Sequence, residues 1–259
     1  MMNSFMEWGY MGSYHREYGV RTMVRLGIHS HPHALITGAS GSGKSTTLLW
    51  LIGKLLQADS NIVIFLCDFK RSEDFSFFQP YTNYYSGNDC YDGIMRFYEL
   101  FSAIRENGSA GTRYLLIFDE YPAFLNYLQM QDKQNKTKKA NDILGAVAEI
   151  LMLGRGTGNG FGVWIVTQRP DSNLFASGSR DNFMVVLALG RLSKEQKGMV
   201  FAGEDIPDRI FKVGEGMLLA DGREIIEVKY PIITDIGTWK RNVLAILMRS
   251  GGACATREA

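Results

Sequence analysis

Short, continuous apolar runs alternate with longer amphipathic stretches through the middle of the chain. The apolar runs fall at residues 34–37, 61–67, 114–118, 161–166 and 183–189. Runs of this kind are typical of strands in a parallel sheet that is covered on both faces. Helical patterns lie between them, at residues 45–56, 89–105 and 141–153. This alternation predicts βαβ units and a doubly wound parallel sheet.

A C-terminal hairpin is predicted after the last of these runs. Residues 216–220 and 224–228 are apolar segments on either side of Asp221-Gly222, a dipeptide typical of hairpin turns. The predicted fold class is therefore α/β. It consists of a mostly parallel, doubly wound sheet flanked by helices, with a C-terminal β-hairpin.

The length and composition suit one such domain. The chain has 259 residues, of which 46% are apolar, enough for a single α/β domain with a sizeable core. We expect this domain to span residues 31–248. Residues 1–30 are rich in aromatic residues and methionine without a clear period, and are expected to form a strand-bearing lead-in. Residues 249–259 are small and polar, as in a flexible tail.

Charge and cysteine content limit the possible partners and the compartment. The chain has 28 Lys and Arg against 27 Asp and Glu, so any contact with nucleic acid requires a local basic patch. Its three cysteines are scattered without metal-ligand spacing, which favours a reducing cytoplasm over a disulfide framework. Neither a signal-peptide pattern nor an apolar run of about 18 residues occurs. We expect a cytoplasmic protein, with any recruitment to the inner face of the membrane supplied by a partner.

Three histidines alternate just before the first apolar run. His29, His31 and His33 could lie on one face of a strand and bind a metal ion. Pro32 interrupts that strand pattern, so a polar loop leading into a buried strand is the favoured interpretation.

Residues 38–45 match the P-loop pattern at every specified position, with an apolar strand before them and a helix after them. Glycines let such a loop turn its backbone N–H groups toward phosphate, and the following helix adds its positive end. Lys44 is placed to reach the β- and γ-phosphates of ATP and Ser45 to bind Mg²⁺. The predicted nucleotide-binding residues are Gly38, Ala39, Ser40, Gly41, Ser42, Gly43, Lys44, Ser45 and Thr46.

Polar residues follow two other predicted strands. Asp119 ends the strand at 114–118, where a P-loop enzyme holds the Mg²⁺ shell. Glu120 comes next and can act as the general base for water. Gln168 follows the strand at 161–166 and is a candidate to contact the attacking water or the γ-phosphate. A kinase does not need such a base, and the sequence between the P-loop and Asp119 contains no Leu-Ser-Gly-Gly motif of an ABC-type ATPase.

These motifs together resemble one family. The P-loop, Phe-Asp-Glu at 118–120 and Thr-Gln-Arg-Pro at 167–170 are similar in order and spacing to the FtsK/SpoIIIE branch of the FtsK–HerA ATPases. Further similarities are Asp68-Phe-Lys70, the segment from Asn182 to Lys194, and Gly214-Glu-Gly-Met-Leu218. The resemblance covers roughly residues 30–232.

The resemblance implies an ATP-driven RecA-like motor that forms a ring, usually a hexamer, and pulls double-stranded DNA through its pore. In such rings an arginine reaches the γ-phosphate of the neighbouring subunit. Arg155, in Arg-Gly-Thr-Gly, matches this position, although Asn159 and Gly160 add two residues before the strand. Lys194 is a second candidate to act across the interface.

The sequence departs from the family in its flanking regions. The family's membrane-spanning N-terminal region and its C-terminal winged-helix domain have no counterpart in these residues. We therefore expect a stand-alone motor of a plasmid or mobile element, active in conjugative transfer or DNA partitioning. A membrane-embedded protein or a relaxase would be a partner supplied by other chains.

One local basic patch is a candidate DNA contact. Residues 129–141 are polar and are expected to form a loop, with several lysines against the single acidic residue Asp132. Such charges suit contacts to DNA phosphates, but solvated surface is an equally good interpretation. Arg180, before Asn182, is a further candidate by resemblance. The candidate lysines are Lys133, Lys136, Lys138 and Lys139.

The sequence thus predicts a Mg²⁺-dependent ATPase that translocates double-stranded DNA as a homo-hexamer. Two alternatives stay open at this point. The first is an ATPase of a type VII secretion or type IV coupling system, which moves protein or a protein–DNA complex. The second is a nucleotide-gated assembly module with slow turnover.

Overall fold

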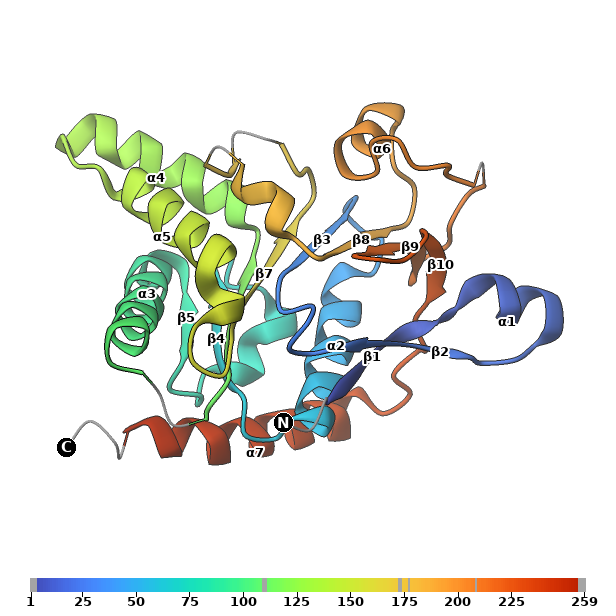
Figure 1. The fold of residues 1–259 in the computed structure, drawn as a ribbon, viewed down its shortest axis with the longest axis horizontal. Helices are drawn as coiled ribbons and strands as arrows, with labels where there is room; N and C mark the ends of the chain where they lie inside the picture. Colours follow the sequence, from blue (N-terminus) through green and yellow to red (C-terminus); the bar gives the residue numbers. More distant parts are fainter. Residues whose placement is uncertain (1–3, 109–110, 172–173, 177, 208, 256–259) are drawn as a thin grey trace.

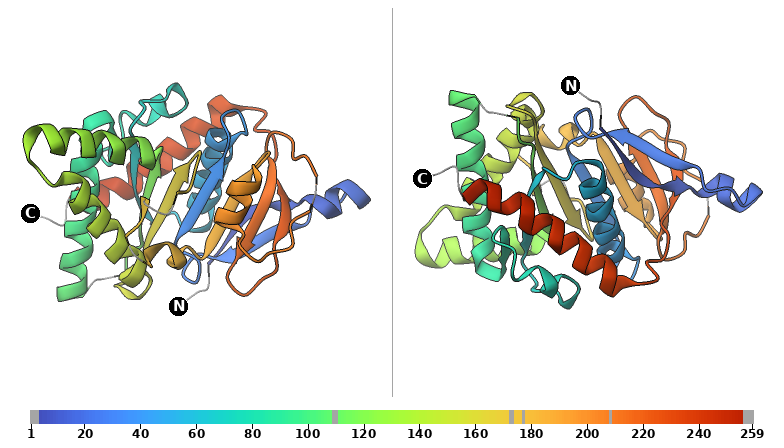
Figure 2. Two further views of the ribbon diagram at one scale, coloured as in Figure 1. Left: turned by 90° about the horizontal axis from the view of Figure 1, so that it is seen from above. Right: turned by 90° about the horizontal axis from the view of Figure 1, so that it is seen from below.

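Ten strands form one twisted sheet with helices on both faces (Figures 1 and 2). The computed structural model describes residues 4–108, 111–171, 174–176, 178–207 and 209–255. The strands are β1 (Phe5–Met11), β2 (Met23–Gly27), β3 (Ala34–Gly38), β4 (Val63–Asp68), β5 (Tyr84–Ser86), β6 (Tyr114–Asp119), β7 (Phe161–Thr167), β8 (Val185–Leu189), β9 (Glu215–Ala220) and β10 (Ile226–Lys229). The helices are α1 (Gly12–Tyr18), α2 (Lys44–Ala58), α3 (Cys90–Asn107), α4 (Tyr121–Asn135), α5 (Lys139–Leu153), α6 (Lys194–Val200) and α7 (Ile236–Ala255).

The strand order is β2-β1-β10-β9-β8-β3-β7-β6-β4-β5. The six strands from β8 to β5 run parallel, whereas β9, β10, β1 and β2 add antiparallel pairs. The five apolar runs of the sequence correspond to β3, β4, β6, β7 and β8, so the α/β prediction is confirmed. The C-terminal hairpin is confirmed as β9 and β10, with a turn closed by the Arg223 N–H donating to Ala220 O at 3.0 Å.

Two hydrophobic cores explain why the central strands are apolar at every position. In β3, Ala34 and Ile36 face one core and Leu35 faces the other, because side chains alternate along a strand. Helices α2 and α7 cover the first face, and α3, α4 and α5 cover the second (Figure 2). Both faces of the central strands are thus removed from water.

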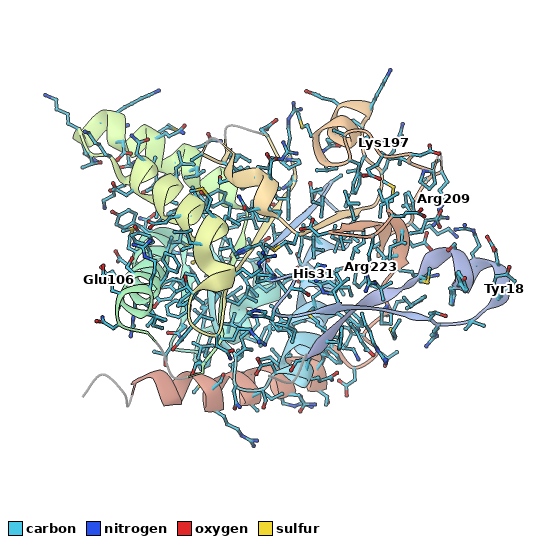
Figure 3. The ribbon with its side chains drawn as sticks, viewed as in Figure 1. Tyr18, His31, Glu106, Lys197, Arg209 and Arg223 are labelled. Atoms are coloured by element: carbon cyan, nitrogen blue, oxygen red, sulfur yellow. The ribbon has the colours of Figure 1, made fainter. Side chains whose placement is uncertain are left out.

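The N-terminal residues are part of the same sheet. β1 pairs with β10 and with β2, and its register shifts between Glu7 and Tyr10, where Gly9 has φ 100°. The lead-in expected at residues 1–30 therefore supplies two strands of the sheet, and Trp8 packs on Trp164 at 5.2 Å between ring centroids. Helix α1 extends from the sheet as an arm, with the exposed Tyr18 at its tip (Figures 1 and 3).

Helix α7 is longer than the sequence pattern suggests. It lies across α2 and continues to Ala255, past the boundary at residue 249 where the sequence predicts a flexible tail. Trp239 anchors it: the indole Nε1 donates to Leu49 O at 3.1 Å. A Cβ on Gly53 would lie 2.3 Å from the same ring, so the indole fills the space that this glycine leaves. Among the described residues, no helix combines the length and apolar character needed to cross a bilayer.

Candidate functional site

The P-loop joins the central strand β3 to the buried helix α2. Gly41 and Gly43 have φ 77° and 92°, values that glycine adopts without steric cost, so the loop can fold tightly. The Lys44 Nζ donates to the carbonyl oxygens of Gly38 at 2.6 Å and Ala39 at 3.0 Å. Partial burial lowers the pKa of this ammonium group. The predicted nucleotide-binding residues 38–46 thus run from the last residue of β3, through the loop, into the first turn of α2.

Parallel pairing brings the acidic residues to the same end of the sheet. In the registers of β4, β6 and β7, Asp68 lies opposite Asp119, and Asp119 lies opposite Val166. Glu120 follows β6 in the left-handed region, with φ 59°. Its N–H donates to Val166 O at 3.1 Å, which directs the chain out of the strand and into α4. Asp119 and Glu120 are therefore brought beside the P-loop as their positions in the sequence predict.

Asp119 is the most strongly perturbed carboxyl group of the cleft. It is 8% exposed. Burial, reinforced by the negative charges of Glu120 and Asp68, raises its pKa to about 7. Lys70 and Lys44 act in the opposite direction. A carboxyl group held among other carboxylates has a strong electrostatic preference for a nearby cation.

Glu120 is held by two side chains from different elements. Its Oε1 accepts from the Gln168 Nε2 at 2.8 Å and forms an ion pair with the Lys70 Nζ at 2.8 Å. Gln168 comes from the end of β7 and Lys70 from the turn after β4. Glu120 and Gln168, predicted separately from the sequence, are thus in direct contact. Sequence analysis noted Lys70 only as a point of resemblance and gave it no role.

Asp68 builds the turn that carries Lys70. It is fully buried, and its Oδ2 accepts from the Ser72 N–H at 2.8 Å and the Tyr84 hydroxyl at 2.9 Å. Burial raises its pKa, and these hydrogen bonds oppose the rise. The sequence signal that could have identified Asp68 as a site residue is its position, because Asp68, like Asp119, ends an apolar strand.

An open cleft of ≈ 350 Å³ lies between the P-loop and these side chains. Three of the residues along it were not predicted as site residues: Lys70, Ser72 and Asp74. The lining residues are Ser40, Gly41, Gly43, Lys44, Ser45, Thr46, Lys70, Ser72, Asp74, Asp119, Glu120 and Gln168.

The residues of the cleft suit a Mg²⁺ ion held together with phosphate. Ser45 and Asp119 both line it and offer oxygen atoms, the ligands that Mg²⁺ prefers. Among the described residues, no group of three or more His, Cys, Asp or Glu side chains could hold a metal ion by itself. Mg²⁺ commonly binds through one or two protein oxygens plus substrate phosphates and water, so this donor set fits.

Helix α6 is connected to Gln168. Ser193 caps the helix in a capping box with Gln196, and the Gln196 Nε2 donates to the backbone oxygen of Gln168 at 3.1 Å. Lys194 is exposed in the first turn of α6. It therefore lies on an element that touches the cleft but does not line the cleft itself.

Arg155 lies at the opposite edge of the sheet. It is exposed in the short 3₁₀ segment Gly154–Gly156, which packs against Phe161 at the start of β7, whereas Gln168 follows the other end of that strand. β7 has 7 residues, so about 20 Å separates the two ends at about 3.3 Å per residue. Arg155 cannot reach the cleft of its own subunit.

The segment 129–141 is helical over most of its length, which corrects the expected loop. Helix α4 continues to Asn135 and α5 starts at Lys139, so only residues 136–138 connect them. The reason is Asp132, whose carboxylate accepts from the backbone N–H groups of Lys139 at 3.0 Å and Ala140 at 2.8 Å. Asp132, which in the sequence is a single acidic residue among lysines, thus caps helix α5.

The candidate lysines lie at the tip of this α4–α5 hairpin, and all are exposed (Figure 1). Lys139 is positioned 4.7 Å above the ring centroid of Tyr91. Arg180 differs from them: it is half-buried and donates to the backbone oxygen of Met199. The tip is formed by Lys133, Lys136, Lys138 and Lys139.

The three histidines do not gather. His33 is buried, and its Nδ1 accepts from the Val163 N–H at 3.1 Å. Burial, with a contribution from the Arg155 charge, lowers the pKa of His33 to about 3. His29 is exposed and His31 contacts Ser30. The favoured loop interpretation therefore agrees with the arrangement of these residues.

Known proteins resemble this chain in sequence and in fold. A model of the FtsK/SpoIIIE family matches residues 13–105. The FtsK domain-containing protein YdcQ of Bacillus subtilis (strain 168) is 26% identical over 246 residues, which is 88% of this chain and 49% of YdcQ. The chain thus spans about half the length of this relative.

Solved structures show the same fold at low sequence identity. The pCW3 conjugation coupling protein TcpA, solved with ATPγS, has a TM-score of 0.71 and 18% identity over 95% of this chain and 71% of TcpA. EssC of Geobacillus thermodenitrificans has a TM-score of 0.67 and 12% identity, over 96% of this chain and 49% of EssC. The type VII secretion ATPase EccC of Thermomonospora curvata has a TM-score of 0.65 and 17% identity, over 95% of this chain and 31% of EccC. The fold is that of RecA-like P-loop ATPases. In its sequence matches, the chain is similar to FtsK/SpoIIIE-type ATPase domains.

Proposed function

We propose that this domain hydrolyses ATP with Mg²⁺ and uses the energy to translocate double-stranded DNA as a homo-hexameric ring. The observation that carries the proposal is the contact of Glu120 with Gln168, within the cleft that Lys44 of the P-loop also lines. This contact supports a base and an amide next to the position expected for the γ-phosphate, as hydrolysis of the terminal phosphoanhydride bond by water requires.

Each residue has a defined part in the proposed reaction. The P-loop N–H groups and Lys44 bind the phosphates. Ser45 and Asp119 would hold Mg²⁺, which would neutralise negative charge on the phosphates. Glu120 accepts the proton of the attacking water, and Gln168 orients that water or contacts the γ-phosphate. Because Gln168 is bonded to Gln196, a change at the γ-phosphate can be passed to helix α6.

The position of Arg155 supports the proposed ring. About 20 Å of β7 separates it from its own cleft, so it can act on a γ-phosphate only when a neighbouring subunit presents one. A ring with the cleft edge of one subunit against the Arg155 edge of the next meets this need. Lys194, exposed on α6, is proposed as a second contact across that interface.

The proposed cargo is DNA, and the proposed contact is the basic tip of the α4–α5 hairpin. Its lysines project into solvent, with Arg180 as a further candidate. The similarity to a conjugation coupling protein supports transfer of DNA by a plasmid or mobile element. We further propose that the domain works in the cytoplasm and that a membrane-embedded or relaxase partner recruits it.

The similarity to EssC and EccC favours a second candidate, an ATPase that moves protein or a protein–DNA complex. The two candidates differ in what stimulates hydrolysis. The test is the rate of ATP hydrolysis in Mg²⁺ with and without linear duplex DNA, with EDTA as the control. Stimulation by DNA supports the first candidate. Mg²⁺-dependent hydrolysis that DNA does not change supports the second, and a very slow rate under every condition supports a nucleotide-gated assembly module.

A further inference from the structure

Lys70 is a charged side chain of the cleft to which the proposed reaction gives no part. Of the described residues that line the cleft, two are lysines, Lys44 and Lys70. The Lys44 Nζ donates to two carbonyl oxygens of the P-loop itself. The Lys70 Nζ instead lies 2.8 Å from Oε1 of Glu120. The contact of a cation with the proposed base therefore calls for an explanation of its own.

The two donors to the Glu120 carboxylate bind the same oxygen. The Gln168 Nε2 reaches Oε1 at 2.8 Å, and the Lys70 Nζ reaches the same atom. A carboxylate has two oxygens, and each can accept about two hydrogen bonds. Oε1 is therefore filled by these two side chains. Oε2 is the oxygen of Glu120 that is left to accept a hydrogen bond, and then a proton, from water.

The two donors come from the strands on either side of the one that carries Glu120. In the sheet, β6 lies between β7 and β4. Gln168 follows β7, and Lys70 follows β4. The backbone of Glu120 is itself held, because its N–H donates to Val166 O at 3.1 Å. The carboxylate is thus attached to both neighbouring strands, which limits rotation about the bonds of its side chain.

The turn that carries Lys70 is ordered without help from Glu120. The Asp68 Oδ2 accepts from the Ser72 N–H at 2.8 Å, and Asp68 O accepts from the Arg71 N–H at 3.3 Å. Arg71 has φ 56°, in the left-handed region that residues with a side chain seldom adopt. Its guanidinium packs on Gly87, where a Cβ would lie 2.7 Å from the Arg71 Nε. The Lys70 ammonium group therefore extends from a well-defined backbone.

We propose that Lys70 is a positioning residue for hydrolysis: by binding Oε1 together with Gln168, it directs Oε2 of Glu120 toward the attacking water. A general base must lie within hydrogen-bond reach of the proton that it takes, so the orientation of the carboxylate matters as well as its charge. This inference rests on the proposed role of Glu120 as the base.

The test separates positioning of the base from binding of phosphate. The kcat of Mg²⁺-dependent ATP hydrolysis and the dissociation constant for ATPγS are measured on the full chain for wild type and Lys70→Met. Methionine is similar in length to lysine but has no charge. We expect kcat to fall by about 10²-fold, as for other small misplacements of reacting groups, and ATPγS affinity to change little. Weaker ATPγS binding with unchanged kcat would assign Lys70 to the phosphates and overturn the proposal.

A double-mutant cycle tests whether the effect acts through Glu120. In the Glu120→Gln background, Lys70→Met should not lower the remaining turnover further, because no base is left to orient. Equal losses in the wild-type and Glu120→Gln backgrounds would show that Lys70 acts independently of Glu120, and would overturn the proposal.

Lys54→Met is the matched control. It removes an ion pair of similar length, 2.9 Å from Lys54 to Glu7, on a part of α2 that does not line the cleft. We expect it to change neither constant, and a loss of turnover equal to that of Lys70→Met would overturn the positioning role. Wild-type kcat in Lys70→Met, with turnover lost in Glu120→Gln, overturns that role alone. Wild-type protein that does not hydrolyse ATP overturns the proposed function, and this inference with it.

Discussion

The ammonium group of Lys70 lies 2.8 Å from Oε1 of Glu120, the carboxylate proposed to accept a proton from water. The two residues come from turns after different strands. The Lys70 side chain is 47% exposed to solvent. Lys70 therefore restricts the position of the Glu120 carboxylate.

Replacing Glu120 with glutamine tests the base. The amide oxygen of Glu120→Gln can still accept from Lys70 and Gln168, so the cleft keeps its shape. An amide cannot take the proton of water, and we expect turnover to fall by about 10²–10⁴. The measurements are the steady-state ATPase rate and the dissociation constant for ATP, which should change little. A variant with wild-type turnover would remove Glu120 from this role.

Arg155→Ala tests catalysis between subunits. Because this residue lies far from its own cleft, ATP affinity should stay close to wild type, while hydrolysis falls by roughly 10³ or more, as for other arginine fingers. Mixed rings of Arg155→Ala and Lys44→Ala should regain part of the activity, since Lys44→Ala subunits still supply the arginine. Mixtures that co-assemble without any recovery would contradict a role in trans.

Alanine at Lys133, Lys136, Lys138 and Lys139 tests the tip of the α4–α5 hairpin. Asp132 is kept, because its carboxylate caps α5. We expect DNA stimulation to be lost and basal ATPase to be retained. Each lost phosphate contact should lower the slope of log affinity against log salt by about 0.9. The matched control removes exposed positive charge from α7, with Arg241→Ala and Arg249→Ala. Equal slopes in wild type and the lysine variant would show that the tip is only solvated surface.

His33 is expected to make folding sensitive to acid. Burial holds its pKa at about 3 in the folded state, below the ordinary value of 6.5 for histidine, so the unfolded chain binds the proton more tightly. The stabilisation is complete above pH 6.5 and is lost as the pH falls toward 3, by at most about 1.4 kcal/mol per pH unit. In His33→Asn, which can still accept from Val163, urea unfolding at pH 7.5 and 5.0 should show a smaller difference than in wild type. His29→Asn, at an exposed position, is the control and should behave as wild type.

Gly53→Ala tests the attachment of α7. The added methyl group would meet the Trp239 indole at 2.3 Å. We expect a loss of about 1–3 kcal/mol in the free energy of unfolding, as for other overpacked sites. Gly145→Ala is the matched control: this helical glycine is exposed with open space around it, so alanine should stabilise by up to about 1 kcal/mol. Equal effects of the two substitutions in urea titrations would contradict the tight packing of Trp239.

The local parts of the site were predictable from the sequence. A P-loop depends on glycines at set positions and on a strand and helix next to it, all within residues 34–58. Asp119 and Glu120 were found because carboxyl ends of parallel strands meet at one edge of a sheet. The helix at 236–255 was missed, and so was the helical character of residues 129–135. In both places, tertiary packing and the Asp132 cap outweigh a weak apolar pattern.

Local sequence patterns were enough to identify the buried strands and the phosphate-binding loop, because burial pattern and backbone geometry are local properties. Long-range packing was needed to bring Lys70 and Gln168 to one oxygen of Glu120, to pair β1 with β10, and to bring Val213 against Gly43. These contacts depend on strand order. A continuous apolar run fits any central position of a sheet equally well, so the order is chosen by the packing of the whole chain.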